Sequence, residues 1–413
     1  MMERLIFHID VNNAFLSWTA VDLLKKGYPI DIRKIPAVIG GDEDARRGIV
    51  TAKSPVAKKM GIVTAESLYS ARKKCPDLKV FPGNYNLYHH NSNLLYKYFC
   101  LFTDKIERYS VDECFLDMTG TELLYPDPIK LAYKMKDEIY KKFGYTVNVG
   151  IANNKLCAKM ASDFEKPNKV HTLFSYEIEN KMWPLPVGDL FMIGKSSAKA
   201  LTEMGIKTIG DLAKCDVTLL RRRFKNQADF MHEYANGIDF SEVITHYGKS
   251  KSISTTETLP KDIDNIVDLR KILLRQSNRV GRQARQQMLY ARTIAVIFKT
   301  SEFVSYSHQM KLVNPTNVTK EIYKYACNVL EKGWKKEPIR LIGIRLDNLT
   351  SNNEKQISLF DDKLSESDDK IQKVLDNISD KYGDNIIMPA SLKEKDKWYY
   401  EFGIYKLNIG RRN

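Results

Sequence analysis

The sequence has no hydrophobic run long enough to cross a membrane and no low-complexity tract. No apolar stretch approaches about 18 residues, the length a membrane-spanning helix needs. The N-terminal stretch MMERLIFHIDV has no signal-peptide pattern. We therefore expect a cytoplasmic protein with no membrane partner.

Cysteine is scarce, and no two cysteines form a CxxC pair. The six are Cys75, Cys100, Cys114, Cys157, Cys215 and Cys327. This scatter indicates neither a zinc site nor a disulfide framework, and a reduced compartment fits it.

Acidic charge is in deficit. The chain has 51 Asp and Glu against 65 Lys and Arg, a formal net charge of +14. Such an excess favours an anionic partner, nucleic acid above all, although a basic protein without that role is the alternative. The 413 residues, of which 43% are apolar, predict two to four domains with cores of their own.

Two adjacent carboxylates, Asp112 and Glu113, interrupt the otherwise apolar stretch YSVDECFLDM at residues 109–118. Burying a charge is costly unless it is paired or bound to a metal. Successive strand residues point to opposite faces, so the two acids can share a site only near a strand end or a bulge. A surface hairpin with two exposed acids is the alternative.

A third carboxylate, Asp10, lies near the end of the predicted buried strand RLIFHIDV, residues 4–11, just before a helix. Helical spacing of apolar residues follows, and Asn12 or Asn13 can cap that helix. The unpaired N–H groups at such a helix start suit a phosphate. A second amphipathic helix at residues 127–144 and the strand YTVNVGIA complete an α/β layer that brings the three carboxylates together.

The three candidate ligands are carboxylates, and oxygen ligands suit Mg²⁺, for which Mn²⁺ can substitute. Two such ions, about 3.5–4 Å apart, can activate an attacking oxygen and stabilise a leaving one. This is phosphoryl-transfer chemistry, in which catalysis is mainly positioning and charge neutralisation.

After the proline-rich boundary MWPLPVGDL, residues 182–190, two short helices follow with Gly194 and Gly205 at their turns. Such a helix pair can bind a nucleic-acid phosphate through turn N–H groups, with a plain αα-hairpin as the alternative.

Residues 250–349 predict the order βαββαβ, the split-βαβ, ferredoxin-like pattern. Its first helix is rich in arginine, including Arg279, Arg282 and Arg285. We interpret this segment as a separate DNA-binding domain, and a solvated basic face is the alternative.

Five stretches, in this order, resemble the Y-family, or translesion, DNA polymerases of the bacterial UmuC/DinB kind: HIDVNNAF, AKKMG, YSVDECFLD, VGIANNKLCAKMASDFEKPN and IGKSSAKALTEMGI. The resemblance covers the chain to about residue 350. It implies an α+β multidomain fold, a right-hand polymerase whose domains are palm, small fingers, helical thumb and a βαββαβ little finger.

The resemblance also implies roles for single residues. Asp10, Asp112 and Glu113 would hold two Mg²⁺, with the Val11 carbonyl as a further ligand. Phe15 would be the steric gate that favours deoxynucleotides, although a core phenylalanine is the alternative. Lys166 and Lys58 would bind the triphosphate, with solvated lysines as the alternative.

Three positions depart from the family pattern. Asn12 stands where many relatives have Asp, Pro55 replaces a common Tyr of the fingers, and Met192 replaces a usual Gly in the first thumb hairpin. Lys58 falls where many relatives have Arg, so the charge is kept but the bidentate fork is lost. These changes leave the metal-site residues intact.

By resemblance, residues 1–30 and 80–175 form the palm, 31–79 the fingers, 176–240 the thumb and 250–349 the little finger. The polar stretch after residue 350 is interpreted as a linker within a C-terminal tail, residues 350–413. In it QISLF, residues 356–360, looks like the peptide by which bacterial polymerases bind the sliding clamp. Gln356 would make polar contacts, and Leu359 and Phe360 would fill an apolar pocket.

The sequence therefore predicts template-directed, low-fidelity DNA synthesis past damaged bases. Its expected partners are primer–template DNA, deoxynucleoside triphosphates and the sliding clamp, and we expect a monomeric catalytic subunit with no proofreading exonuclease. Two alternatives stay open: a metal-dependent nuclease, and a DNA- and clamp-binding relative without activity.

Overall fold

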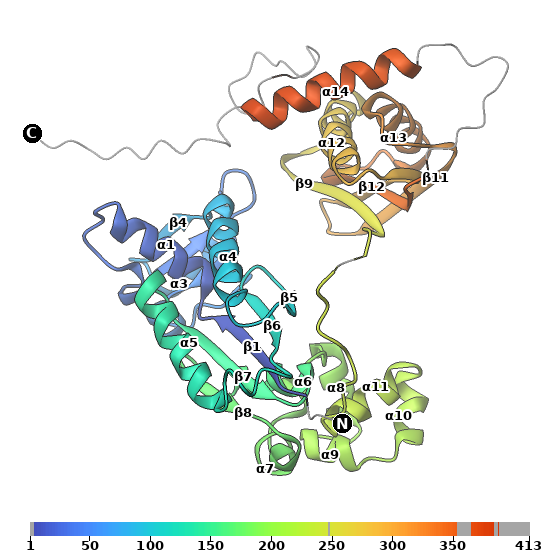
Figure 1. Ribbon diagram of the computed structural model, residues 1–413. Helices are drawn as coiled ribbons and strands as arrows, with labels where there is room; N and C mark the ends of the chain where they lie inside the picture. The colour runs from blue at the N-terminus through green and yellow to red at the C-terminus, as the bar shows by residue number, and fades with distance from the viewer. Residues whose placement is uncertain (1–3, 247, 353–364, 384–386, 388–413) are drawn as a thin grey trace, which may run out of the picture. The chain divides into compact units, whose positions relative to one another are not determined.

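The computed structural model describes residues 4–246, 248–352, 365–383 and 387 (Figure 1). The chain divides into two compact units. The first comprises Met1–Glu43 and Gly48–Tyr247, and the second Asp44–Arg47 and Gly248–Asn413. Residues 250–349 lie within the second unit, and the predicted domains, little finger included, stay predictions.

The first unit is built on a five-stranded sheet in the order β5-β6-β1-β7-β8. The strands are β5 (Ile106–Arg108), β6 (Glu113–Asp117), β1 (Ile6–Val11), β7 (Val147–Ala152) and β8 (Val170–Thr172). Strand β1 lies in the middle, antiparallel to both neighbours, and all six of its residues are buried.

Alternation along β1 sends its side chains into two different cores. Phe7, Ile9 and Val11 pack with α4 (Tyr85–Phe99) and α5 (Pro128–Phe143). Ile6 packs on the other face with α6 (Lys155–Asp163). His8 and Asp10, at the same alternation as Ile6, therefore lie on the α6 face of the sheet.

The two helices predicted in this layer are present. Helix α1 (Ala14–Lys25) follows β1, with Asn13 as its N-cap residue in a left-handed conformation, φ 52°. The helix predicted at 127–144 is α5. It begins where the Asp127 carboxylate accepts from the Lys130 N–H and ends at Gly144, whose φ is 82°. These are ordinary start and stop signals for a helix.

A small sheet in the order β3-β2-β4 fills the segment predicted as fingers. Its elements in chain order are η1 (Ile32–Lys34), β2 (Ala37–Gly40), β3 (Val50–Lys53), α2 (Pro55–Lys59), α3 (Leu68–Lys74) and β4 (Lys79–Pro82). This sheet has a compact apolar core of its own.

Short helices make up the segment predicted as thumb. They are η2 (Ser175–Glu177), α7 (Ile178–Lys181), η3 (Val187–Asp189), α8 (Lys195–Glu203), α9 (Ile209–Lys214), α10 (Val217–Phe224) and α11 (Gln227–Ala235). Their apolar residues share one core with α6, which ties this cluster to the sheet.

The second unit has the predicted βαββαβ order. Its elements are β9 (Ser252–Ile263), α12 (Ile266–Gln286), β10 (Tyr290–Thr300), β11 (Ser305–Thr316), α13 (Thr319–Gly333) and β12 (Ile339–Thr350). The sheet order is β11-β10-β12-β9, and α12 and α13 pack on it through one apolar core.

The C-terminal segment contains a helix that the linker interpretation did not include. Helix α14 (Ser365–Tyr382) lies against α12 (Figure 1), where Arg285 pairs with Asp376 and Arg282 with Asp380. Its polar, mixed-charge sequence concealed the helix, because the contacts with α12 include ion pairs to residues distant in the chain.

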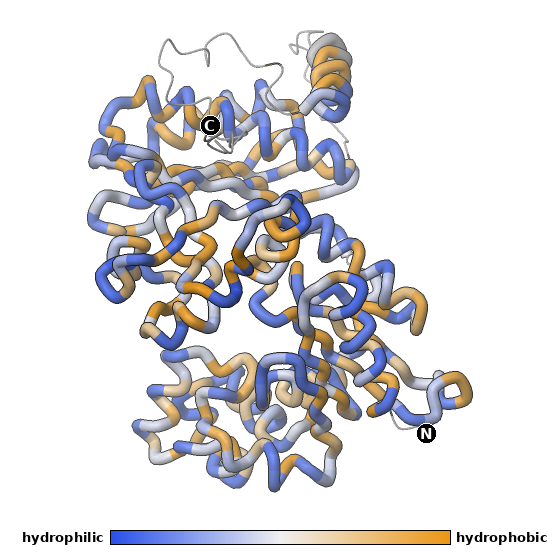
Figure 2. Tube along the Cα trace, turned by 90° about the vertical axis from the view of Figure 1, so that its left-hand side faces the viewer, coloured by the Kyte–Doolittle hydropathy of each residue, from blue (hydrophilic) through white to orange (hydrophobic). Residues whose placement is uncertain are grey.

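The helices alternate between hydrophilic and hydrophobic residues along the chain, as elements that bury one face should (Figure 2). Within the described ranges, no helix combines the length and the apolar character that a membrane crossing needs.

Helix α6 approaches the sheet closely at Gly150 on β7. A Cβ atom at this position would lie 2.0 Å from the Ala158 carbonyl oxygen and 2.5 Å from the Ser162 nitrogen, both backbone atoms of α6. Only glycine therefore lets α6 pack onto the sheet at this distance.

We predict that Gly150→Ala pushes α6 off the sheet and lowers the free energy of unfolding by roughly 3 kcal/mol or more. Gly248→Ala is the matched control, because its Cβ would meet no atom within 4 Å. Equal urea midpoints for the two variants would contradict this packing account.

Candidate active site

The sheet register brings the predicted carboxylates to one edge. Asp10, near the end of β1, lies directly opposite Glu113, the first residue of β6. Asp112 precedes the strand in a turn, and its carbonyl oxygen accepts from the Val11 N–H at 3.1 Å. The two adjacent acids can share a site because only Glu113 belongs to the strand.

The turn that holds Asp112 is fixed by its own hydrogen bonds. The Tyr109 and Ser110 N–H groups both donate to the Glu113 carbonyl oxygen, at 3.0 and 3.2 Å. The Ser110 hydroxyl donates to the Asp112 carboxylate at 2.7 Å. The backbone therefore places this carboxylate before any ligand arrives.

Two lysines neutralise the site from the α6 side. Lys159 of α6 pairs with Glu113, and Lys166, just beyond α6, pairs with Asp10. Asp163 bridges them, 2.7 Å from the Lys166 ammonium and 3.5 Å from that of Lys159. Ammonium groups thus contact two of the three carboxylates.

Burial dominates the electrostatics of the acids. It raises the pKa of Asp10 to about 6 even though Lys166 opposes the shift. Burial also raises the pKa of Asp112, assisted by the neighbouring Glu113 charge. Both carboxyls are thus poised to gain from any additional positive charge.

The donor set fits a hard divalent cation, because it consists of carboxylate oxygens and the two lysines show that positive charge is favourable here. Within residues 4–246, 248–352 and 365–383, however, no three His, Cys, Asp or Glu side chains converge as a preformed metal cluster. Asp10 and Glu113 instead point at lysines.

His8 lies two residues before Asp10 and is fully buried. Its Nδ1 lies 2.8 Å from the Ser162 hydroxyl oxygen, and that hydroxyl can donate to the Lys159 carbonyl oxygen at 2.7 Å. Burial and the nearby lysines hold the His8 pKa well below its usual value, so the ring is neutral. Its Nε2, 3.9 Å from Glu113, therefore forms no ion pair.

Phe15 lies on α1 in an aromatic cluster, partly exposed. Its ring stacks on Tyr88 with centroids 4.5 Å apart and an interplanar angle of 12°, and meets Tyr85 edge-on at 6.2 Å. Tyr88 in turn hydrogen-bonds the Thr19 hydroxyl at 3.1 Å. The cluster holds the Phe15 ring in one orientation.

Lys58 is exposed on α2, as a phosphate-binding residue should be. Pro55 is the first residue of this helix, and the Ser54 hydroxyl caps it by accepting from the Ala57 N–H at 3.0 Å. Lys53 lies nearby, and its pKa is lowered mainly by burial and also by the charge of Lys58. Two neighbouring cations of this kind favour an anion.

The backbone of the predicted thumb hairpin is strained at Met192, the residue that replaces a usual glycine. Met192 adopts a left-handed backbone, φ 72°, and its side chain is 61% exposed. Gly194, two residues later, is the N-cap residue of α8 and is open to a ligand, since a Cβ there would meet nothing within 4 Å. The unfavourable backbone of Met192 explains why glycine is usual at that position.

The three predicted DNA-binding arginines lie on α12. Arg279 is exposed, whereas Arg285 contacts Asp376 at 2.6 Å and Arg282 contacts Asp380 at 2.5 Å. Acidic groups of α14 thus already pair with two of them. The DNA-binding role of all three stays a prediction. The predicted clamp peptide, with Gln356, Leu359 and Phe360, lies outside the described residues.

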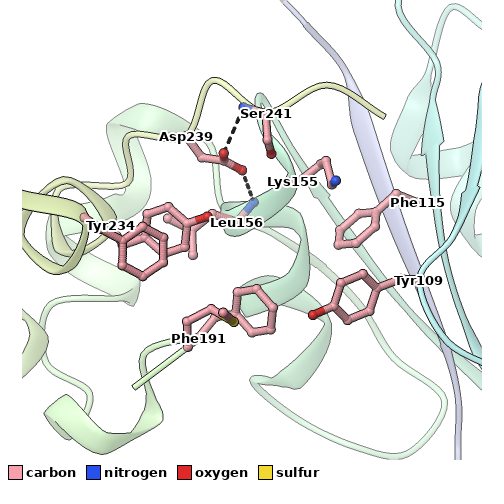
Figure 3. A pocket seen from close by; sticks show the side chains of 10 residues that line it. Tyr109, Phe115, Lys155, Leu156, Phe191, Tyr234, Asp239 and Ser241 are labelled. Atoms are coloured by element: carbon pink, nitrogen blue, oxygen red, sulfur yellow. Dashed lines mark hydrogen bonds between the residues drawn. The ribbon is translucent and has the colours of Figure 1, made fainter. Parts of the chain in front are cut away.

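Beside the turn of residues 109–112 lies an aromatic cavity of about 200 Å³ (Figure 3). The rings of Tyr109 and Phe115 face those of Phe191 and Tyr234 across it, with Lys155 and Asp239 at the rim. Asp239 accepts from the Leu156 and Ser241 N–H groups at 3.0 and 2.9 Å. The cavity therefore lies where the segment after α11 attaches to the start of α6.

Two residues of the site were not singled out from the sequence. Lys159 lies within the stretch VGIANNKLCAKMASDFEKPN, and Lys53 lies just before AKKMG. The spacing Lys155–Lys159 places two lysines on one face of a helix, a signal that could have identified Lys159.

We predict that Asp10 makes the chelator-treated protein less stable as the pH rises from 4 to 6. Its folded pKa, about 6, exceeds its ordinary value of 3.8. The folded state therefore binds the proton more tightly than the unfolded state. The resulting contribution to the free energy of unfolding is fully present below pH 3.8 and is lost as the pH rises through 6. The shift corresponds to about 3 kcal/mol.

The measurement is urea unfolding of the wild type and of Asp10→Asn in EDTA at several pH values. The wild type should lose stability relative to the variant across this range. A constant difference between them would contradict the elevated pKa.

Comparison with known proteins agrees with this geometry. Residues 9–163 match the model of the impB/mucB/samB family, and residues 250–359 match that of the impB/mucB/samB family C-terminal domain. Among solved structures, a Y-family DNA polymerase chimera has the same fold, with a TM-score of 0.71 and 24% identity. That match covers 84% of this chain and 100% of the chimera.

Curated relatives match along almost their whole length. The DNA polymerase IV of Clostridium acetobutylicum is 48% identical over 396 residues, 96% of this chain and 100% of that protein. The DNA polymerase IV of Clostridium kluyveri is 36% identical, again over 96% and 100%. The DNA polymerase IV 2 of Bacillus subtilis is 32% identical over 95% of each chain. The chain therefore belongs to the impB/mucB/samB family, the UmuC/DinB-like Y-family polymerases.

Proposed function

We propose that this chain is a template-directed DNA polymerase that adds deoxynucleotides to a primer 3′ end and continues past damaged template bases. The observation that carries the proposal is the edge of the five-stranded sheet. There Asp10 and Glu113 lie opposite each other, Asp112 lies in the adjoining turn, and lysines approach from the α6 side.

The three carboxylates would hold divalent cations, Mg²⁺ in the first instance, with the Val11 carbonyl as a further ligand and Mn²⁺ as a substitute. When bound, two such ions neutralise charge on the phosphates and favour the oxygen nucleophile and the leaving group. The residues of the chain provide the rest: a turn fixed by Ser110 and a neutral His8 that adds no competing charge.

Lys166, Lys58 and Lys53 would bind the triphosphate of the incoming nucleotide. Lys166 is the residue best placed to exchange partners, because it is 38% exposed and already reaches Asp10. When a triphosphate binds, Lys166 would pair with a phosphate group, and the Asp10 carboxylate would be free to bind a metal ion. Catalysis of this kind depends on positioning and charge neutralisation.

Phe15 would act as the steric gate. Its stacking on Tyr88 fixes the ring, and a fixed ring beside the nucleotide sugar crowds a 2′-hydroxyl. The small three-stranded sheet that carries Lys58 would enclose the nascent base pair only loosely. Weak geometric selection of this kind is consistent with acceptance of damaged templates.

Primer–template DNA would meet the second unit on its open sheet face. Side chains opposite the α12 and α13 core include the neighbouring set Ser254, Arg345, Ala295 and Gln309, aligned across the four strands. Lys299 and Lys311 lie on the same face by alternation. Small polar groups with interspersed cations suit a phosphate backbone. Arg279, Arg282 and Arg285 remain additional candidates on α12.

The peptide QISLF would bind the sliding clamp and raise the local concentration of the polymerase at primer ends. We propose a single chain as the catalytic unit. A nuclease using the same carboxylates would need neither a gate such as Phe15 nor a triphosphate lysine, and a relative without activity would have no reason to keep all three carboxylates.

Primer extension with the purified chain tests the proposal. With Mg²⁺ and all four deoxynucleoside triphosphates, we expect extension on intact and damaged templates. Asp112→Ala and Glu113→Ala should lower the incorporation rate by about 10³-fold or more, since each removes charge needed in the transition state. Binding to primer–template should persist in both variants.

The control is Asp104→Ala just before β5, an exposed carboxylate at the end of the sheet away from Glu113. It should extend primers at the wild-type rate. Release of nucleotides from labelled DNA without added triphosphates would favour the nuclease, and binding without extension in Mg²⁺ or Mn²⁺ would favour the inactive relative.

A further inference from the structure

Two asparagine side chains form a buried amide pair beside the carboxylates. Asn148 lies on β7 directly opposite Asp10 and is fully buried. Asn12 follows β1 and is 8% exposed. The Asn12 Nδ2 donates to the Asn148 Oδ1 at 3.1 Å. Buried amides are costly unless their hydrogen bonds are made, so their partners define what the pair does.

Asn148 makes four hydrogen bonds, as many as its amide usually makes. Its Nδ2 donates to the Ser162 and Glu165 carbonyl oxygens at 2.9 and 2.7 Å. Its Oδ1 accepts from Asn12 and from the Lys169 N–H, at 3.2 Å. Rotating the amide by 180° would set oxygen against two carbonyls, so the orientation of Asn148 is fixed.

The fixed orientation of Asn148 dictates that of Asn12. The Asn12 Nδ2 must face the Asn148 oxygen, which leaves its Oδ1 to accept from the Asn168 N–H at 2.9 Å. An aspartate at position 12 could not donate to Asn148. Asn148 therefore requires an asparagine at position 12, where many relatives have aspartate.

Together the pair holds backbone groups on both sides of Lys166. The Glu165 carbonyl lies before it, and the Asn168 and Lys169 N–H groups lie after it. The same Lys166 reaches Asp10, which is the strand neighbour of Asn148. One hydrogen-bond network thus connects the strand of the first carboxylate with the loop of the lysine.

We infer that Asn12 and Asn148 are positioning residues that set where Lys166 meets the triphosphate of the incoming nucleotide. The inference rests on the proposed polymerase function. Because the amides bind each other and backbone groups on both sides of Lys166, their loss should displace the lysine and weaken nucleotide binding more than it slows the chemical step.

Single-turnover incorporation tests the inference, because it separates nucleotide affinity from the maximal rate. Asn148→Leu keeps the branched shape and adds no charge. We expect it to raise the apparent nucleotide Kd about tenfold, with the maximal rate changed less. Asn12→Leu removes only two side-chain hydrogen bonds and should act in the same direction. It carries the test if Asn148→Leu does not fold.

The matched control is Asn236→Leu at the end of α11, whose amide donates to the Ala213 and His232 carbonyl oxygens. It should lower the Tm without changing the nucleotide Kd. In a Lys166→Ala background, which should itself raise the Kd, Asn148→Leu should have no further effect.

An unchanged Kd in folded Asn148→Leu or Asn12→Leu overturns the inference, and so does a full effect that persists without Lys166. A wild-type Kd in Lys166→Ala overturns it as well, because the lysine would then not bind the nucleotide. Absence of extension by the wild type would instead contradict the proposed function.

Discussion

Repulsion between three carboxylates at one sheet edge is the constraint around which the first unit is organised. Asp10 and Glu113 face each other across paired strands, and Asp112 lies in the turn just before Glu113. Burial makes their ionisation costly, so the fold has to supply positive charge. Lys159 and Lys166 do so, and the acids are thereby held ready for cations that arrive with a substrate.

The surrounding fold follows from keeping these lysines close. Helix α6 carries Lys159 and can approach the sheet only because β7 has glycine at position 150. The loop after α6 carries Lys166 and is held by the Asn12–Asn148 amide pair. Strand β1 separates this charged face from an apolar core made with α4 and α5. Sheet, helix and loop thus form one support for a set of opposite charges.

Much of this arrangement could be predicted from the sequence, where periodicity and motifs are local. The strand that carries Asp10, helix α5 and the βαββαβ order of the second unit were all predicted and are present. The sequence predicted that Asp112 and Glu113 could share a site only if a strand end or a bulge lies between them, because neighbouring strand residues point to opposite faces. It did not reveal that the strand begins at Glu113, which leaves Asp112 in a turn.

Features that depend on contacts between residues distant in the chain could not be predicted from the sequence. Lys159 is an ordinary helical lysine until the fold places Glu113 beside it. Helix α14 has a polar sequence, and two of its aspartates contact Arg282 and Arg285, which lie more than 90 residues earlier in the chain. The Asn12–Asn148 pair joins the residue after β1 to a residue of β7 and fixes a third segment. Residues of this kind gain their roles from tertiary structure, not from their neighbours in the chain.

The central claim is that lysines and metal ions exchange places at the carboxylates when substrate binds. A crystal structure with primer–template, a non-reactive nucleotide analogue and Mn²⁺ tests it directly. The account predicts anomalous density at Asp10, Asp112 and Glu113, with the Lys166 ammonium on the triphosphate. Carboxylates still paired with Lys159 and Lys166 beside a bound nucleotide, with no manganese signal, would contradict it.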